Sequence, residues 1–223
     1  LLRSLRSAVS ATASIAAVAG VLALMATPST ARADEGMWTF DNFPIQTVND
    51  KYGTRIDQAW LDRVRNAAVR IQGCSASFVS DQGLILTNWH CVVGCAQELS
   101  SPEQDYVKNG FLTANREEEK RCPGQTAEVL VDIVDVTDRV LAAGAGLEGA
   151  AFNAARTAET NAIQTEACAG DPKFNCQVIS FYRGGRYAMY KFRRYADVRL
   201  VFAPENHAAL FGGHPDNCNF PRY

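Results

Sequence analysis

The sequence GCSASFVSDQGLILTNWHC at residues 73–91 constrains the fold more than any other part of the chain. Residues 75–79 and 84–86 are short and apolar, and Ser-Asp-Gln-Gly between them is typical of a turn, so we predict two strands joined by a turn. Small residues around the first strand allow the close backbone approach that a tight barrel corner requires. The second strand leads to His90, which predicts a histidine held rigidly beside a cleft.

The first 33 residues have the order of a secretory signal. Two arginines precede a largely apolar run at residues 11–25, and Ala-Arg-Ala at residues 31–33 is a small-residue cleavage site. The run is short, rich in Ala, Ser and Thr, and has no stop-transfer charges behind it. We therefore predict a signal peptide at 1–33, cleavage after Ala33, and no stable insertion in a membrane.

The composition is that of a globular domain. The net charge of −2 and the hydrophobic content of 47% argue against a disordered chain and against a nucleic-acid surface. Removing the first 33 of the 223 residues leaves a chain long enough for one sizeable core. We predict that 34–223 forms one unit.

Seven cysteines in an exported chain indicate disulfides. A bridge between Cys74 and Cys91 would tie the two predicted strands together behind His90, and closing such a loop is worth roughly 3 kcal/mol. The sequence alone does not determine connectivity, but the economical further pairs are Cys95 with Cys122 and Cys168 with Cys176, which leaves Cys218. The alternative is a zinc site formed by His90, Cys91 and Cys95. It lacks a second ligand pair at finger spacing, so we expect no metal and no cofactor.

The rest of the chain predicts a mainly β fold with helical insertions. Periodicity and composition predict helices at 57–70 and 147–167, and strands at 128–136, 178–182, 186–194 and 198–203. We expect a polar, loop-rich segment after Cys91 up to Pro123, in which the charge run at 116–121 forms a solvated helix face. The last residues, FGGHPDNCNFPRY at 211–223, have the glycine and proline content of a shaped loop.

These motifs resemble those of known peptidases. The run around His90 resembles the first barrel of trypsin-like serine peptidases, in which the general-base histidine follows such a strand. Across the chain, DEGMWTFDNFP, CSASFVSDQGLILTNWHC, YVKNGFLTANREEEKRCPG, RYADVRLVFAPE and FGGHPDNCNFPRY resemble the N-terminal part of bacterial serine dipeptidyl peptidases of the dipeptidyl-peptidase 7 and 11 family. The resemblance extends from residue 34 to residue 223.

The resemblance implies a chymotrypsin-like double β-barrel, of which this chain carries the first barrel. His90 matches the general base, and Asn217 and Cys218 match positions that hold the α-amino group of the substrate. The triad Asp and the nucleophilic Ser are expected beyond Tyr223, so the chain by itself is expected to be inactive. The implied substrates are peptides with a free N-terminus. The implied location is the periplasm, with outer-membrane association, secretion and a homodimer left open.

Three departures from the family pattern keep two alternatives open. Trp89 replaces a histidine, His214 stands where an aspartate is common, and Cys218 stands where a tryptophan is usual. One alternative is a periplasmic trypsin-like endopeptidase, because the run from Gly83 to Val92 also fits that group. The other is a catalytically dead barrel that acts as a binding module.

Overall fold

The computed structural model describes residues 36–210. The chain divides into two units, Leu1–Trp38 and Thr39–Tyr223, and all elements below belong to the second. The predicted signal peptide at 1–33 and the terminal loop at 211–223 lie outside the described residues.

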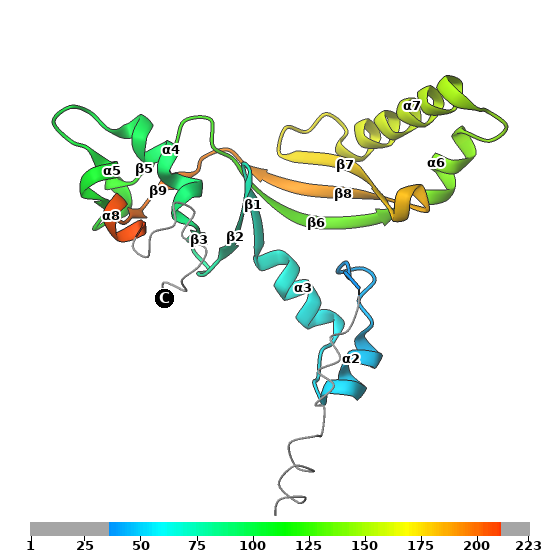
Figure 1. Cartoon of the computed structure of the whole chain (residues 1–223), viewed down its shortest axis with the longest axis horizontal. Coiled ribbons are helices and arrows are strands. Elements are labelled where there is room, and N and C mark those ends of the chain that lie inside the picture. Colours follow the sequence, from blue (N-terminus) through cyan, green and yellow to red (C-terminus); the bar gives the residue numbers. More distant parts are fainter. Residues whose placement is uncertain (1–35, 211–223) are drawn as a thin grey trace, which may run out of the picture. The chain divides into compact units, whose positions relative to one another are not determined.

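The largest sheet is six-stranded and antiparallel, with the strand order β3–β2–β1–β6–β8–β7 (Figure 1). Its strands are β1 (Ala68–Ile71), β2 (Cys74–Phe78), β3 (Ile85–Thr87), β6 (Ala127–Asp135), β7 (Phe174–Phe181) and β8 (Arg186–Tyr195). The strands predicted at 75–79, 84–86, 128–136, 178–182 and 186–194 all belong to this sheet, with shifted ends. The prediction of a mainly β fold with helical insertions is confirmed.

The sheet is open within the described residues, whereas the family resemblance implied a barrel. Strands β3 and β7 are its two edges, and no strand in residues 36–210 joins them. A barrel requires every strand to have two neighbours. Strand β3 has only three residues, and the chain then turns into a helix at Trp89, so little of this edge is available for pairing.

Helix α3 (Gln58–Ala67) follows helix α2 (Ile45–Tyr52) and leads into the sheet. Its N-cap is Asp57, whose carboxylate accepts a hydrogen bond from the backbone N–H of Trp60 at 2.7 Å and so satisfies the first turn. The helix predicted at 57–70 is confirmed up to Ala67, but residues 68–70 belong to β1. Val69 and Ile71 are β-branched and buried, which favours a strand over another helical turn.

Helices α6 (Thr137–Ala143) and α7 (Gly149–Cys168) cover one face of the sheet at β7 and β8 (Figure 1). The helix predicted at 147–167 is therefore confirmed. Four buried residues form the core between helices and strands: Val140, Ile163, Tyr187 and Met189. The disulfide between Cys168 and Cys176 joins the end of α7 to β7, as predicted.

Strands β7 and β8 are joined by a tight turn that contains the 3₁₀ helix η2 (Tyr182–Gly184). Gly184 has a φ of 93°, and a Cβ at this position would lie 2.9 Å from the hydroxyl oxygen of Tyr187. The turn therefore requires glycine here, in agreement with the predicted hairpin.

The prediction of loop structure between Cys91 and Pro123 is wrong for its first part. Residues 89–99 form helix α4 (Trp89–Leu99), in which Val92, Cys95 and Leu99 lie on the side that packs into a core. These apolar residues have helical spacing in the sequence, but Gly94 and the polar residues after it obscured the pattern. The short elements that follow are α5 (Tyr106–Asn109), β4 (Phe111–Leu112), the 3₁₀ helix η1 (Arg116–Glu118) and β5 (Lys120–Arg121), so the charge run is not one helix face.

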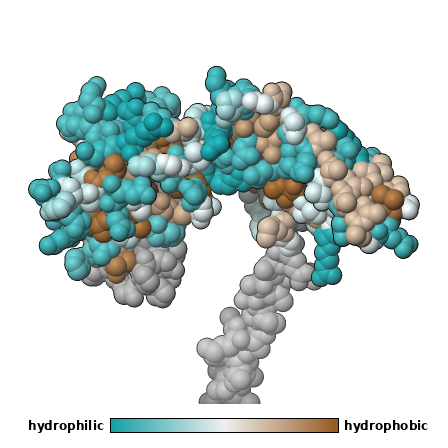
Figure 2. All heavy atoms as spheres, turned by 90° about the horizontal axis from the view of Figure 1, so that it is seen from above, coloured by the Kyte–Doolittle hydropathy of each residue, from teal (hydrophilic) through white to brown (hydrophobic). Residues whose placement is uncertain are grey.

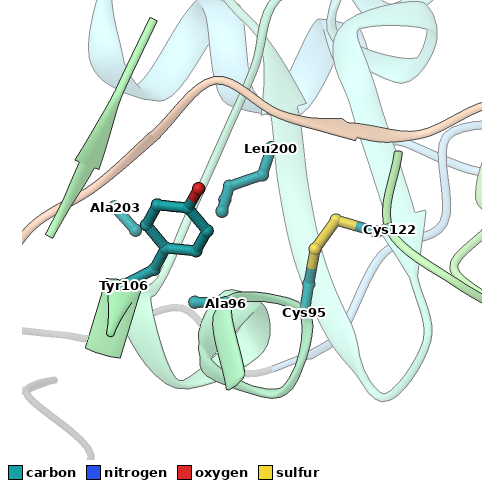
Figure 3. Packing of buried hydrophobic residues seen from close by; sticks show 6 residues of the cluster. All are labelled: Cys95, Ala96, Tyr106, Cys122, Leu200 and Ala203. Atoms are coloured by element: carbon teal, nitrogen blue, oxygen red, sulfur yellow. A yellow bond between two sulfur atoms is a disulfide. The ribbon is translucent and has the colours of Figure 1, made fainter. Parts of the chain in front are cut away.

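A second core lies between α4, α5 and the segment that returns after β8. Its buried residues are Cys95, Ala96, Tyr106, Cys122, Leu200 and Ala203, and Figure 3 shows the disulfide between Cys95 and Cys122 beside the Tyr106 ring. The strand predicted at 198–203 is two short strands, β9 (Arg199–Leu200) and β10 (Phe202–Ala203). They pair with β5 and β4 respectively, so they cannot form one continuous strand. Helix α8 (Asn206–Ala209) follows.

A polar network spans the junction of β1 and β6. The Nε–H of Arg70 donates to Glu128 Oε2 at 2.9 Å, and the Nδ2–H of Asn175 donates to Glu128 Oε1 at 2.8 Å. The Arg70 guanidinium also lies 4.0 Å from the centroid of the Phe192 ring. Burial alone would raise the pKa of Glu128, but the hydrogen bonds from Arg70 and Asn175 hold this pKa below its ordinary value of 4.5.

None of the helices in residues 36–210 has both the length and the apolar character that a membrane span needs. On the face seen in Figure 2, hydrophobic residues form separate groups among hydrophilic ones.

Candidate active site

His90 lies in the first turn of α4, where the chain leaves the sheet. Strand β3 ends at Thr87, and Asn88 is the extended N-cap residue of the helix, with φ −78° and ψ 153°. The sequence predicted a histidine directly after a strand, and the structure makes it the second residue of a helix instead. The side chain of His90 is exposed, as a proton acceptor for a bound group must be.

The disulfide between Cys74 and Cys91 fixes this turn to the sheet. Its Cα atoms are 6.1 Å apart, and it joins the first residue of β2 to the residue that follows His90. The predicted pairing is confirmed. The hydroxyl of Thr87 also donates to the carbonyl oxygen of Ser75 at 2.9 Å, which joins β3 to β2 a second time. The backbone that carries His90 is therefore held by both covalent and hydrogen bonds.

Helix α4 is anchored on its other side by Trp89. The indole Nε1–H donates to the carbonyl oxygen of Pro204 at 3.0 Å, across 115 positions of the sequence. Sequence reasoning noted Trp89 only as a departure from a family pattern and missed this role. The indole N–H of a tryptophan usually donates to an acceptor when the ring is buried, and Trp89 is half-buried. The presence of a tryptophan next to His90 was therefore the only sequence signal for this hydrogen bond. Pro204 comes shortly before α8 and the terminal loop, so Trp89 connects the His90 turn to the segment that enters this loop.

Both cysteines of the alternative zinc site are in disulfides. Cys91 pairs with Cys74, and Cys95 pairs with Cys122. A bridged cysteine has no thiolate to offer a metal, so the set His90, Cys91 and Cys95 does not form a zinc site in this state.

The other predicted site residues are Asn217 and Cys218, and they lie outside the described residues together with His214. Their position relative to His90 stays a prediction.

Residues 33–223 match the sequence profile of peptidase S46. The chain belongs to the peptidase S46 family. Among its relatives in this family, a dipeptidyl-peptidase 7 of Phocaeicola vulgatus is 33% identical over 207 residues, covering 86% of this chain and 29% of the relative. An Asp/Glu-specific dipeptidyl-peptidase of Porphyromonas endodontalis is also 33% identical, covering 86% of this chain and 29% of the relative.

Solved structures of the family resemble the fold. The crystal structure of Porphyromonas endodontalis DPP11 in complex with substrate matches with a TM-score of 0.71 and 29% identity, covering 85% of this S46 chain and 30% of that one. The structure of the same protein with the dipeptide Arg-Glu matches with a TM-score of 0.69 and 28% identity, covering 86% and 29% of the two chains. The S46 chain thus spans less than a third of the length of its relatives, and the predicted family is confirmed.

Proposed function

We propose that this chain is the N-terminal portion of a serine-type dipeptidyl peptidase that removes dipeptides from peptides with a free N-terminus. One observation carries the proposal: in a chain of the S46 family, an exposed histidine is held at the edge of a sheet by the bridge between Cys74 and Cys91. The relatives that match are named as dipeptidyl peptidases.

In this proposal His90 is the general base. A serine hydroxyl is a weak nucleophile, and a neutral imidazole within hydrogen-bond reach takes its proton as it attacks the peptide carbonyl. A carboxylate on the other ring nitrogen would select the tautomer and stabilise the imidazolium. Both partners are expected beyond Tyr223. The described residues hold the backbone that carries the imidazole, because a disulfide and the Trp89 hydrogen bond restrain the turn around His90.

Asn217 and Cys218 are the proposed site for the substrate's α-amino group. An amide oxygen of Asn217 can accept a hydrogen bond from the ammonium group, and such a polar site rejects a substrate that cannot satisfy it. The Trp89–Pro204 bond supports this assignment, because it tethers the segment that precedes the loop to the His90 helix.

The double barrel of the family resemblance is also part of the proposal. Three apolar residues of the β2–β3 hairpin, Val79, Leu84 and Leu86, are 53%, 47% and 61% exposed. Exposed apolar side chains next to a catalytic residue are suited to packing against a further part of the same protein. We infer that residues outside the described range complete the first barrel here and that the second barrel packs nearby.

Export to the periplasm completes the proposal. The segment at 1–33 has the features of a signal peptide. Within residues 36–210 three disulfides join all six cysteines, which is typical of proteins that fold in an oxidising compartment.

The test uses the full-length protein and two reporter dipeptides, one with a free N-terminus and one acetylated. We expect cleavage of the free reporter and, because acetylation removes the charge that the amine site pairs with, at least about a hundredfold lower kcat/KM for the acetylated one. Asn217→Ala should raise KM for the free reporter and so reduce the difference in kcat/KM between the two reporters. Equal cleavage of both reporters would support the endopeptidase alternative, and cleavage of neither would support a binding module.

A further inference from the structure

We propose that reduction of the Cys74–Cys91 disulfide converts the His90 turn into a three-ligand site for a soft divalent cation such as Zn²⁺. The two Sγ atoms and a ring nitrogen of His90 all lie within 4.8 Å of one another. Among residues 36–210 no other group of three histidine, cysteine or acidic side chains is placed to share an ion in this way. The metal site goes beyond the proposed peptidase activity, and only its effect on catalysis depends on that activity.

The geometry is close to what zinc requires. Zinc is bound tetrahedrally, with Zn–S near 2.3 Å and Zn–N near 2.0–2.1 Å, so neighbouring ligand atoms lie about 3.3–3.8 Å apart. The ligand atoms of Cys74, His90 and Cys91 all fall within 4.8 Å of one another. Once the S–S bond is broken, the two sulfur atoms have to separate to about 3.8 Å to bind one ion. Two thiolates and one imidazole are ligands that zinc prefers over the hard cations. The fourth position is left to water.

Two hydrogen bonds still restrain the turn when the disulfide is broken. The Thr87 hydroxyl bond to Ser75 and the Trp89 indole bond to Pro204 do not involve either sulfur. They hold β3 against β2 and α4 against the segment after β10, so two restraints on the three ligands remain after reduction. A preorganised set of ligands binds metal more tightly than one that must be assembled.

The reaction is a thiol–disulfide exchange followed by metal binding. A dithiol supplies two electrons and two protons: the bond between the Cys74 and Cys91 sulfurs breaks, two thiols form, and the dithiol becomes a disulfide. Zinc then binds both sulfurs as thiolates and releases their two protons. In the reverse exchange a disulfide oxidant takes up two electrons and two protons and becomes a dithiol, the bond between the Cys74 and Cys91 sulfurs forms again, and the ion is released.

The Cys74–Cys91 disulfide is more accessible to a reductant than the Cys95–Cys122 disulfide. Cys74 and Cys91 are half-buried, whereas Cys95 and Cys122 are 8% and 4% exposed. Because exchange requires a thiolate to reach a sulfur atom, the reductant attacks the Cys74–Cys91 bridge more readily than the Cys95–Cys122 bridge.

The consequence for catalysis follows from the lone pair of His90. A ring nitrogen bound to zinc cannot accept the proton of a serine hydroxyl. The reduced, metal-bound protein is then inactive, and removal of the metal restores the base.

The test is a Co²⁺ titration of the full-length protein with Cys218→Ser, after reduction with a phosphine. We expect the reduced protein to bind one more ion per chain than the same protein with Cys74→Ser and Cys91→Ser, with a thiolate-to-cobalt charge-transfer absorption. His90→Ala keeps both cysteines and should weaken the binding by at least about tenfold. Equal metal uptake with and without these two cysteines, or no effect of His90→Ala, would overturn the proposal.

The Cys168–Cys176 pair is the matched control, because it is also half-buried but has no third ligand grouped with it in the described residues. Replacing both by serine should leave the additional Co²⁺ site intact. In the activity arm, Zn²⁺ should lower reporter cleavage by the reduced enzyme at least tenfold, and a chelator should restore it. Metal uptake with undiminished cleavage would uphold the site and contradict the role of His90 as the base.

Discussion

The six-stranded sheet and the helices beside it form two regions, and each region is stabilised by different interactions. The His90 region, defined as β1, β2, β3 and α4, has short strands of three to five residues and is attached by two disulfides. The helix-covered region, defined as β6, β7, β8, α6 and α7, has strands of eight to ten residues. In its core Val140 is 0% exposed and Ile163 is 4% exposed.

The difference teaches how a reactive residue can be exposed and still rigid. Burial stabilises a residue by removing apolar surface from water, but a catalytic histidine has to face the substrate. The hairpin beside His90 leaves Leu86 61% exposed, so burial cannot be its main restraint. In the β2–β3 hairpin and the His90 turn, cross-links take over that role. The helix-covered region relies mainly on packing, with one disulfide at the end of α7. The following experiments test this contrast, from the largest expected effect to the smallest.

His90→Ala in the full-length protein should have the largest effect on function and almost none on folding. Loss of the general base is expected to lower kcat on a free-N-terminus reporter by about 10⁴-fold or more. His207→Ala is the matched control, because His207 is also an exposed histidine at a helix but is not part of the proposed triad. A His90 variant that keeps most of its activity would show that the base has been misassigned.

Ile163→Ala should destabilise the helix-covered region selectively. Truncating this buried side chain leaves a cavity against Tyr187 and Met189 and should cost about 2–5 kcal/mol of local stability. Hydrogen exchange should become faster in α7, β7 and β8 and stay unchanged in β2 and β3. Equal acceleration in both regions would mean that they unfold as one unit.

Replacing Cys74 and Cys91 by serine should give the opposite pattern. The bridge closes a loop with a sequence separation of 17, and its loss should cost roughly 3 kcal/mol. We expect faster exchange in β2, β3 and the first turn of α4, with α7 unaffected. Replacing Cys168 and Cys176 is the control, and its effect should be confined to the end of α7 and to β7.

Glu128→Gln should weaken the junction between the two regions by a smaller amount. The substitution keeps the shape but removes the charge that pairs with Arg70, and because Arg70 is partly exposed the expected cost is about 1–2 kcal/mol. The pKa of Glu128 is lowered in the folded protein, so its contribution is complete above the unfolded value near 4.5 and is lost as the pH falls through the lower folded value. Acid unfolding curves should therefore converge for the native and variant proteins at low pH. A constant difference at every pH would contradict the assigned role of the charge.

Local sequence patterns were enough to predict the β2–β3 hairpin, the disulfide pairs and two of the helices. Short apolar segments and a turn sequence are short-range signals, so the β2–β3 hairpin was predicted with its ends within one residue. The three disulfide pairs followed from choosing the economical pairings along the chain, and all three are confirmed. Helices α3 and α7 were predicted because their apolar spacing or helix-forming composition extends over several turns.

Tertiary structure decided the features that depend on residues far apart in the sequence. Whether residues 198–203 form one strand or two depends on pairing with β4 and β5, which local propensity does not encode. The Trp89 bond to Pro204 spans 115 positions, and the Arg70 bond to Glu128 spans 58. Such contacts form only when the fold brings their partners together, because a donor in the sequence does not specify its acceptor. The same reason explains why the open sheet was not predicted: closure depends on which strands meet at the edges β3 and β7.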